Sequence, residues 1–329
     1  MSSIHNCSLD DYVDGVLVAD RTWLGRAVTL IESTRSADRI AAMELLGRLL
    51  PHSGGARRIG ITGVPGVGKS TFIDALGTQL TAQGRRVAVL AVDPSSSVSG
   101  GSILGDKTRM PNLAVQDAAF IRPSPSSGSL GGVTRTTRET MTVVEAAGFD
   151  VVLVETVGVG QSETAVADMV DFFLVLMLPG AGDELQGIKK GVLELADALV
   201  VNKSDGGNEI AAQRAMRDYR AALSLTAPVN ATWVPPVLTA SAIHKTGLEQ
   251  VISQIEAYFG AMTESGHLAS RRSAQQVRWM WAMVEDRLRE QLRANDQVRA
   301  LLADLEQKVA TAQTPPSVAA NQILKAFNH

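Results

Sequence analysis

Hydrophobic residues recur with two different periods along this chain, and the period changes near residue 57. Between residues 21 and 50 they recur every three or four positions, which predicts two amphipathic helices. Pro51 ends the second helix, and the polar run 52–55 is expected to form a short linker. The apolar positions of that second helix are Ile40, Met43, Leu46 and Leu50.

Beyond residue 57, short and almost wholly apolar runs alternate with helical stretches. Such runs are typical of parallel strands buried on both faces. The alternation therefore predicts an α/β fold with a doubly wound, mainly parallel sheet. The strand candidates are 58–62, 87–92, 151–155, 172–178, 198–202 and 236–240. The helical stretches lie near 70–83, 134–147, 184–196, 209–224 and 246–262.

Residues 93–132 interrupt this alternation. The forty residues include nine Ser, six Gly and four Pro, a composition that favours a flexible insertion. Loops of this length inside a compact domain are uncommon and are usually functional. We therefore expect a long functional loop here.

The sheet pattern ends near residue 270, and two apolar stripes at helical spacing follow. The stripes could pack on the sheet domain or form an arm that joins a second copy. We expect three parts: a helical extension over 1–56, a nucleotide-binding domain over 57–265, and a helical arm over 266–329. The first stripe comprises Val277, Met280, Trp281, Val284, Leu288 and Leu292.

Composition removes several classes of function. The net charge is −3 and aromatic residues make up 4%, which argues against nucleic-acid binding through bulk charge or base stacking. Cys7 is the single cysteine, so no disulfide within the chain is possible and a reducing compartment is expected. The first twenty residues hold four Asp and no Lys or Arg, and the longest apolar stretch, Phe172–Leu178, is too short to cross a bilayer. We expect a cytoplasmic protein with no membrane or nucleic-acid partner.

A glycine-rich motif joins the first predicted strand to the helix that follows it. In this context its backbone N–H groups can surround a β-phosphate at the positive end of the helix. Lys69 is expected to reach the β- and γ-phosphates and to act in catalysis, and the Ser70 hydroxyl is placed to bind Mg²⁺. The predicted phosphate-binding residues are Gly63, Pro65, Gly66, Val67, Gly68, Lys69, Ser70 and Thr71.

A second motif predicts which base is bound. Asn202, Lys203 and Asp205 follow the run 198–202, and a carboxylate there can accept hydrogen bonds from guanine N1–H and the N2 amino group. A site built for those donors rejects adenine. Ser241-Ala242 fits the companion element, whose backbone N–H meets the guanine O6. The nucleotide is expected to be GTP or GDP rather than an adenine nucleotide.

Acidic residues at strand ends are candidates for the metal side of the site. Glu155 occupies the place of the carboxylate that holds the Mg²⁺ shell, and the Gly158 amide can sense the γ-phosphate. We expect Asp93 to orient the attacking water or the metal shell, because it follows a strand that ends at the nucleotide edge. Asp106 is a second metal-side candidate, and the alternative is that it caps a turn.

Phosphoryl transfer also requires cations at the developing charge. The candidates are Lys107, Arg109, Arg135 and Arg138, and no residue matches the catalytic glutamine of Ras-type GTPases. We therefore expect slow intrinsic hydrolysis that a partner accelerates.

Several long motifs together resemble the MeaB family, the bacterial counterparts of the human methylmalonic aciduria type A protein, formerly labelled ArgK or LAO/AO transport ATPase. The likeness runs from about residue 21 to 310. The motifs that carry it are 69–71, 93–96, 101–110, 155–163 and 178–191.

The resemblance implies a P-loop NTPase fold of the SIMIBI type with an N-terminal helical extension and a C-terminal dimerisation arm. It implies a homodimeric GTPase chaperone that gates adenosylcobalamin loading and protects methylmalonyl-CoA mutase. It also implies switches at 93–110, after Glu155, and at 183–190, where Asp183, Gln186 and Lys189 would communicate with the mutase.

Other interpretations stay open at this point. A metallochaperone GTPase would need clustered Cys and His, whereas the five His here are scattered. A helper of a related acyl-CoA mutase would carry the same motifs. A small-molecule kinase and a scaffold with a vestigial P-loop are further alternatives.

Overall fold

The computed structural model describes residues 7–92, 109–123, 130–156, 161–180, 190–226 and 232–328. Contacts between residues divide the chain into two compact units, Met1–Arg272 and Ser273–His329.

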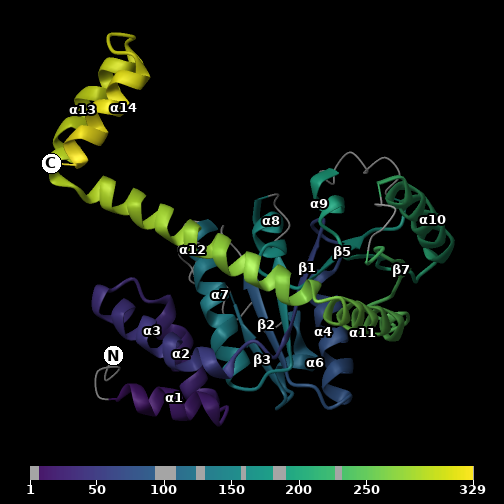
Figure 1. The fold of residues 1–329 in the computed structure, drawn as a ribbon. Coiled ribbons are helices and arrows are strands. Elements are labelled where there is room, and N and C mark those ends of the chain that lie inside the picture. Colours follow the sequence, from purple (N-terminus) through teal and green to yellow (C-terminus); the bar gives the residue numbers. More distant parts are fainter. Residues whose placement is uncertain are drawn as a thin grey trace. The chain divides into compact units, whose positions relative to one another are not determined.

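The first unit is built on one sheet in which all the described strand pairs are parallel, in the order β3-β2-β4-β1-β5-β6-β7 (Figure 1). This confirms the predicted doubly wound α/β fold. The strands are β1 (Arg57–Gly63), β2 (Val87–Val92), β3 (Ala119–Arg122), β4 (Val151–Thr156), β5 (Phe172–Met177), β6 (Ala198–Val201) and β7 (Val237–Thr239).

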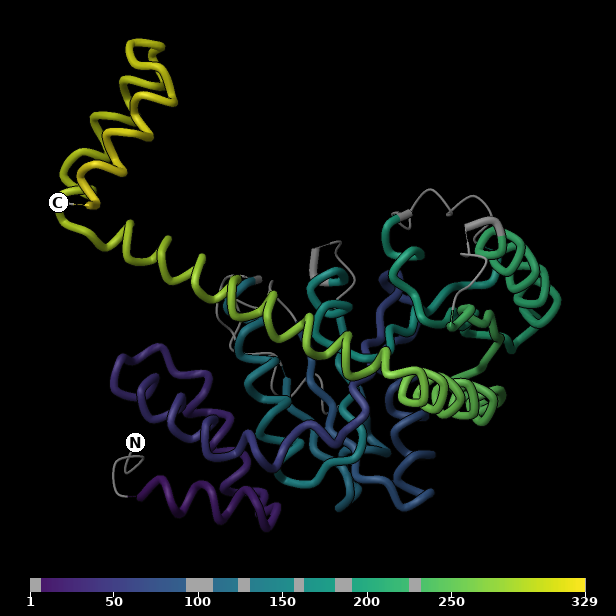
Figure 2. The backbone as a smooth tube through the Cα atoms, in the orientation of Figure 1, coloured from purple at the N-terminus to yellow at the C-terminus, as the bar shows by residue number. Residues whose placement is uncertain are grey.

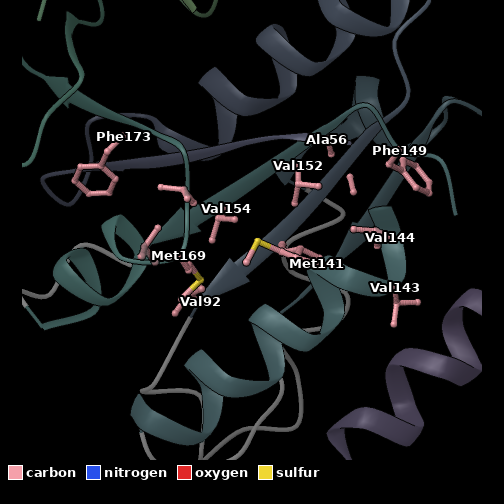
Figure 3. Close-up of a cluster of buried hydrophobic side chains, with 14 of the residues drawn as sticks. Ala56, Val92, Met141, Val143, Val144, Phe149, Val152, Val154, Met169 and Phe173 are labelled. Carbon is pink, nitrogen blue, oxygen red and sulfur yellow. The ribbon is translucent and has the colours of Figure 1, made fainter. Parts of the chain in front are cut away.

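Alternate residues of each central strand enter different hydrophobic cores, because successive side chains of a strand point to opposite faces. In β5, Phe173 and Val175 join one core, and Phe172 and Leu174 join the other. This is why the strands appear as continuous apolar runs in the sequence. Figure 3 shows the first core, where Met141 of α7 points towards the side chains of the sheet.

Helices cover both faces of the sheet. The second core includes residues of α4 (Lys69–Ala82), α6 (Pro111–Ala114) and α11 (Leu248–Glu264). Among the described residues, the first core includes residues of seven helices, and in the tube of Figure 2 the purple N-terminal helices lie beside α7, which they contact. These helices are α1 (Leu9–Leu17), α2 (Arg21–Glu32), α3 (Ser36–Leu49), α7 (Leu130–Ala146), α8 (Gln161–Ala167), α9 (Lys190–Glu194) and α10 (Glu209–Thr226).

The expectation of one long loop over 93–132 is wrong for its described residues. The short helix α6 and the edge strand β3 lie within this stretch, and α7 already begins at Leu130. Strand β3 has only four residues, in which buried and half-buried positions alternate. Because Ser, Gly and Pro surround this short strand, the composition of the whole stretch does not reveal it.

The spacing of apolar residues in α3 predicted the helix correctly but not which of its faces is buried. The helix exists, but its buried face consists of Ala42, Leu45 and Leu49. The side chains of Ile40 and Met43 are more than half exposed instead. Helix α3 is apolar on two sides, and the spacing of apolar residues could not tell which side meets the core.

The second unit consists of helices. Helix α12 (His267–Ala294) begins in the first unit and crosses the boundary, and it is followed by α13 (Asp296–Ala310) and α14 (Pro316–Phe327). Helices α13 and α14 contact each other and bury Val298, Leu305 and Ala319. None of the helices in the described part of the chain combines the length and apolar character needed to cross a membrane.

Candidate nucleotide-binding site

The glycine-rich motif forms the turn between β1 and α4, as predicted. Gly66 and Gly68 have positive φ angles of 79° and 92°, which glycine adopts without the steric penalty of a side chain. Gly63 has a φ of 151°, and a Cβ atom there would lie 2.5 Å from the carbonyl oxygen of Leu176. The motif thus passes close to β5 at a point where only glycine fits.

Lys69 begins helix α4, and its ammonium group lies over the same turn. Its Nζ donates to the carbonyl oxygen of Gly63 at 2.9 Å. Burial lowers the pKa of Lys69, and the carboxylates of Glu155 and Glu163 oppose that shift. Phosphate groups at this turn would favour the charged lysine in the same way as the two carboxylates do.

Ser70 and Glu155 meet across the junction of α4 and β4. The Ser70 Oγ donates to Glu155 Oε1 at 2.8 Å, and Glu155 is buried near the end of its strand. A hydroxyl and a carboxylate side by side are the oxygen ligands that Mg²⁺ prefers. These two residues therefore fit the metal side of a nucleotide site. The described residues contain no group of three or more His, Cys, Asp or Glu placed to hold a metal by themselves.

Asn202 connects the phosphate turn to the predicted base-binding loop. Its side-chain Nδ2 donates to the carbonyl oxygen of Val67 at 2.8 Å, and its Oδ1 accepts from the backbone N of Ala242 at 3.3 Å. The side chain is 1% exposed, so both hydrogen bonds satisfy a buried amide. This side chain thus joins two loops that lie 135 and 40 positions away from it in the sequence.

The two loops predicted to bind the base also contact each other directly. Ser241 Oγ donates to a carboxylate oxygen of Asp205, and the backbone N of His244 donates to Ser241 Oγ at 3.0 Å. Lys203 has a φ of 57° in the left-handed region, and the Cε of its side chain passes 3.9 Å from the position of a Cβ on Gly68. The structure thus brings the second motif and the P-loop together at the carboxyl edge of the sheet, where doubly wound folds bind ligands.

Several predicted site residues lie outside the described residues. They are Asp93, Asp106, Lys107, Gly158, Asp183, Gln186 and Lys189. Among the predicted cations, Arg135 pairs with Glu139 at 3.3 Å and Arg138 donates to the backbone oxygen of Asp168 at 3.2 Å. Arg109 is described and exposed.

The structure adds residues near the site to which no sequence motif assigned a role. Glu163 lies near enough to Lys69 to influence its pKa, and Thr156 Oγ1 donates to Thr62 Oγ1 at 2.7 Å between β4 and β1. Asp74, one turn after Ser70, is buried and bonded to another segment. A buried Asp in a P-loop helix is visible in the sequence as a charged residue between apolar neighbours, but its partners are not.

The chain is similar to several known proteins. It is 47% identical to the GTPase ArgK of Escherichia coli, with 89% of this chain and 88% of that protein covered. It is 44% identical to the mitochondrial methylmalonic aciduria type A homolog of Mus musculus over 97% of this chain and 79% of that protein. The crystal structure of an LAO/AO transport system kinase matches with a TM-score of 0.80 and 37% identity over 100% of both chains.

The family model described as methylmalonyl Co-A mutase-associated GTPase MeaB matches residues 24–297, which include the candidate nucleotide site, the sheet and all of α12. The protein is a P-loop GTPase, and its fold and relatives imply binding of a guanine nucleotide. The predicted resemblance is thereby confirmed, and the chain belongs to the MeaB family of GTPases.

Proposed function

We propose that this GTPase is a chaperone of adenosylcobalamin-dependent methylmalonyl-CoA mutase, gating the loading of the cofactor and protecting the enzyme. The observation that carries the proposal is the match to the mutase-associated family model over residues 24–297, which extends beyond the nucleotide fold into α12. The similarity to a methylmalonic aciduria type A homolog supports the same partner.

The described residues suggest how GTP is held. The P-loop amides and Lys69 would bind the phosphates, and Asp205 would accept hydrogen bonds from the guanine edge. Ser70 and Glu155 would hold Mg²⁺, together with Asp93 and Asp106. The metal would neutralise charge on the phosphate oxygens. Asp93 is assigned to orienting the attacking water or the metal shell.

The proposed communication with the mutase depends on the third switch, residues 183–190. Asp183, Gln186 and Lys189 follow the strand β5 in the sequence, and the family resemblance gives this segment contact with the mutase. Changes there should spare intrinsic hydrolysis and abolish its stimulation by the mutase. Intrinsic hydrolysis is proposed to be slow, so that the mutase controls the timing of each turnover.

We also propose that the chain consists of a helical extension (1–56), a GTPase domain (57–265) and an arm (266–329). Two copies of the chain would form a homodimer through this arm. The support is an exposed apolar stripe on α12. An isolated stripe of this kind is expected to be covered by another protein surface. Its members Val277, Trp281, Val284 and Leu288 are each at least 40% exposed. The single Cys7 is compatible with the cytoplasm as the compartment.

The proposed chaperone role can be tested with a purified, tagged mutase. The protein is expected to co-elute with the mutase in a manner that differs between GDP and a non-hydrolysable GTP analogue, and its GTP hydrolysis should rise when the mutase is added. Lys69→Ala should remove both effects by abolishing nucleotide binding, whereas the control Lys325→Ala, at an exposed position of α14, should keep them.

Three outcomes would change the proposal. Neither binding nor stimulation by the mutase would contradict the chaperone role. Stimulation by isobutyryl-CoA mutase alone would assign the protein to that related enzyme. Unchanged nucleotide affinity in Lys69→Ala would contradict the assignment of the phosphate site.

A further inference from the structure

A buried pair of threonine hydroxyls joins β1 and β4 where both strands reach the candidate nucleotide site. Thr156 Oγ1 donates to Thr62 Oγ1 at 2.7 Å, and both side chains are 0% exposed. The backbone pairing of the two strands ends with Ile61 opposite Glu155. The hydroxyls therefore join the strands one residue further towards the site.

The two hydroxyls lie in a row of residues across the sheet that is otherwise apolar. In the strand register, Thr156 lies opposite Val92 of β2, and Thr62 lies opposite Val175 of β5. Both valines are 0% exposed and belong to the first core, as Figure 3 shows for Val92. Replacing both partners of a buried hydrogen bond by apolar groups of the same shape is often neutral or stabilising. The hydroxyls are therefore not needed to fill this part of the core, and what they add is a directional bond between two particular atoms.

Each of these threonines is next in the chain to a residue of the candidate site. Gly63 follows the threonine of β1, and its carbonyl oxygen accepts from Lys69 Nζ at 2.9 Å. Glu155 precedes the threonine of β4, and its Oε1 accepts from Ser70 Oγ at 2.8 Å. The bond between the hydroxyls thus closes a ring of contacts that runs through β1, the first residues of α4, and β4.

The hydroxyl pair and the carboxylate of Glu155 lie on different faces of the sheet, because successive side chains of a strand point to opposite faces. Ile61, which is paired with Glu155, belongs to the second core together with residues of α4, whereas the valines beside the threonines belong to the first core. A shift of β4 along β1 would change the separation of Glu155 and Ser70, since α4 follows β1 through the P-loop. The hydroxyl bond opposes that shift from the face that the site does not use.

We propose that Thr62 and Thr156 are positioning residues for Mg²⁺-dependent GTP hydrolysis. Their hydrogen bond fixes the end of β4 relative to the P-loop and thereby keeps the Glu155 carboxylate beside the Ser70 hydroxyl. The inference rests on the proposed function, in which Glu155 and Ser70 hold the metal. Residues that orient metal ligands commonly change metal affinity and activity when they are altered.

A double variant separates this role from a contribution to stability. Thr62→Val combined with Thr156→Val removes the hydrogen bond without leaving a buried hydroxyl that has lost its partner, so its Tm should equal or exceed that of the parent. We nevertheless expect the single-turnover GTP hydrolysis rate to fall about 10-fold and the Mg²⁺ concentration for half-maximal hydrolysis to rise about 10-fold. GDP affinity measured without Mg²⁺ should stay within about two-fold, because the P-loop amides remain in place.

The converse variant keeps the hydroxyl and loses packing. Thr156→Ser removes a buried methyl group but retains the donor, so its Tm should fall while its rate and Mg²⁺ requirement stay close to those of the parent. Thr137→Val is the matched control, since Thr137 is a buried threonine of α7 whose hydroxyl donates to the Val133 backbone oxygen of the same helix at 2.8 Å. This control should change neither the rate nor the Mg²⁺ requirement.

The outcomes separate this inference from the proposed function. A Mg²⁺ requirement equal to the parent's in the double variant overturns the positioning role, and so does a rate in Thr156→Ser as low as that of the double variant. If the double variant does not fold, Thr156→Val serves instead: a raised Mg²⁺ requirement supports the inference and an unchanged one overturns it.

Glu155→Gln is measured in parallel. A raised Mg²⁺ requirement in Glu155→Gln together with a parent-like double variant contradicts only the inference. An unchanged Mg²⁺ requirement in Glu155→Gln contradicts the metal-side role of Glu155 and the inference with it.

Discussion

At the scale of single residues, the nucleotide site is held together largely by side chains that bond to backbone groups. Lys69 donates to the Gly63 carbonyl, and the Asn202 amide joins the Val67 carbonyl to the Ala242 amide. The sequence motifs predicted these residues because each motif is local. They could not predict that one asparagine would connect the two loops, because that contact depends on the order of the strands.

Asp205 is proposed to determine the base. Asp205→Asn replaces one carboxylate acceptor by an amide donor, so the N1–H and N2 amino group of guanine lose a partner. Xanthine carries a carbonyl at C2 and can accept from that new donor. We expect GTP affinity to fall by about 10- to 100-fold and xanthosine triphosphate affinity to rise. Titration of both nucleotides checks this, and equal GTP affinity in the variant and the parent would reject the assignment.

A second residue-scale prediction concerns Glu139 in α7. Burial raises its pKa above the ordinary value of 4.5, although Arg135 and Arg39 act in the opposite direction. The folded state therefore binds this proton up to a higher pH than the unfolded state, and the stabilising effect of the proton is lost as the pH rises through the folded-state pKa. Glu139→Gln keeps the neutral form at every pH.

The variant Glu139→Gln should accordingly raise the Tm at pH 7 relative to the parent, and the gain should disappear below about pH 4. Thermal unfolding at both pH values is the measurement. Glu44→Gln, at an exposed position of α3, is the control and should have little effect at either pH. A lower Tm for Glu139→Gln at pH 7 would show that the ion pair with Arg135 outweighs the cost of burial.

At the scale of elements, long apolar or periodic runs in the sequence predicted the central strands and the longer helices. The shortest elements were not predicted. Strands β4 and β5 are buried at every position, and each contains an unbroken apolar run. Strand β3 and helix α6 have four residues each, and their conformation depends on pairing with β2 and on capping by Asp74. Such elements have too few residues for a periodic signal, so tertiary contacts define them.

Two glycines allow a comparison between a position that requires glycine and one that has room for a side chain. Gly63 has a φ of 151° and faces the Leu176 carbonyl, whereas Gly47 lies in α3 with open space where a Cβ atom would lie. Gly63→Ala should destabilise the protein by about 1–3 kcal/mol and weaken nucleotide binding. Gly47→Ala should stabilise it by about 0.5–1 kcal/mol, because alanine favours the helix. Chemical unfolding of both variants measures the two effects, and a stabilising Gly63→Ala would contradict the strained geometry.

At the scale of the whole molecule, the start of α12 is fixed within the first unit by two partly buried ion pairs. Arg272 forms hydrogen bonds of 2.8 and 2.6 Å to the carboxylate of Asp171, and Arg271 pairs with Asp197 at 3.2 Å. The two aspartates directly precede β5 and β6, at the sheet edge opposite the P-loop. Adjacent arginines on a helix therefore join two neighbouring strands. Nothing in the spacing of the four residues in the sequence indicated these pairs.

The proposed dimer makes a prediction at the same scale. Leu288→Glu places a charge in the exposed stripe of α12 and should convert the dimer to a monomer in sedimentation velocity, since a buried unpaired charge is costly. Ala282→Glu adds the same charge away from that stripe and should leave the dimer intact. A monomeric parent protein, or a dimeric Leu288→Glu variant, would contradict the assignment of this face.

The sequence by itself determined the α/β class, the P-loop, the guanine motif and the family, because each depends on residues that are close together in the chain or on long apolar runs. Tertiary structure decided which face of α3 is buried, that Ser70 bonds to Glu155, and that Asp74 caps α6. These features join residues far apart in the sequence. Their partners are set by strand order and helix packing, and such contacts leave no periodic pattern along the chain.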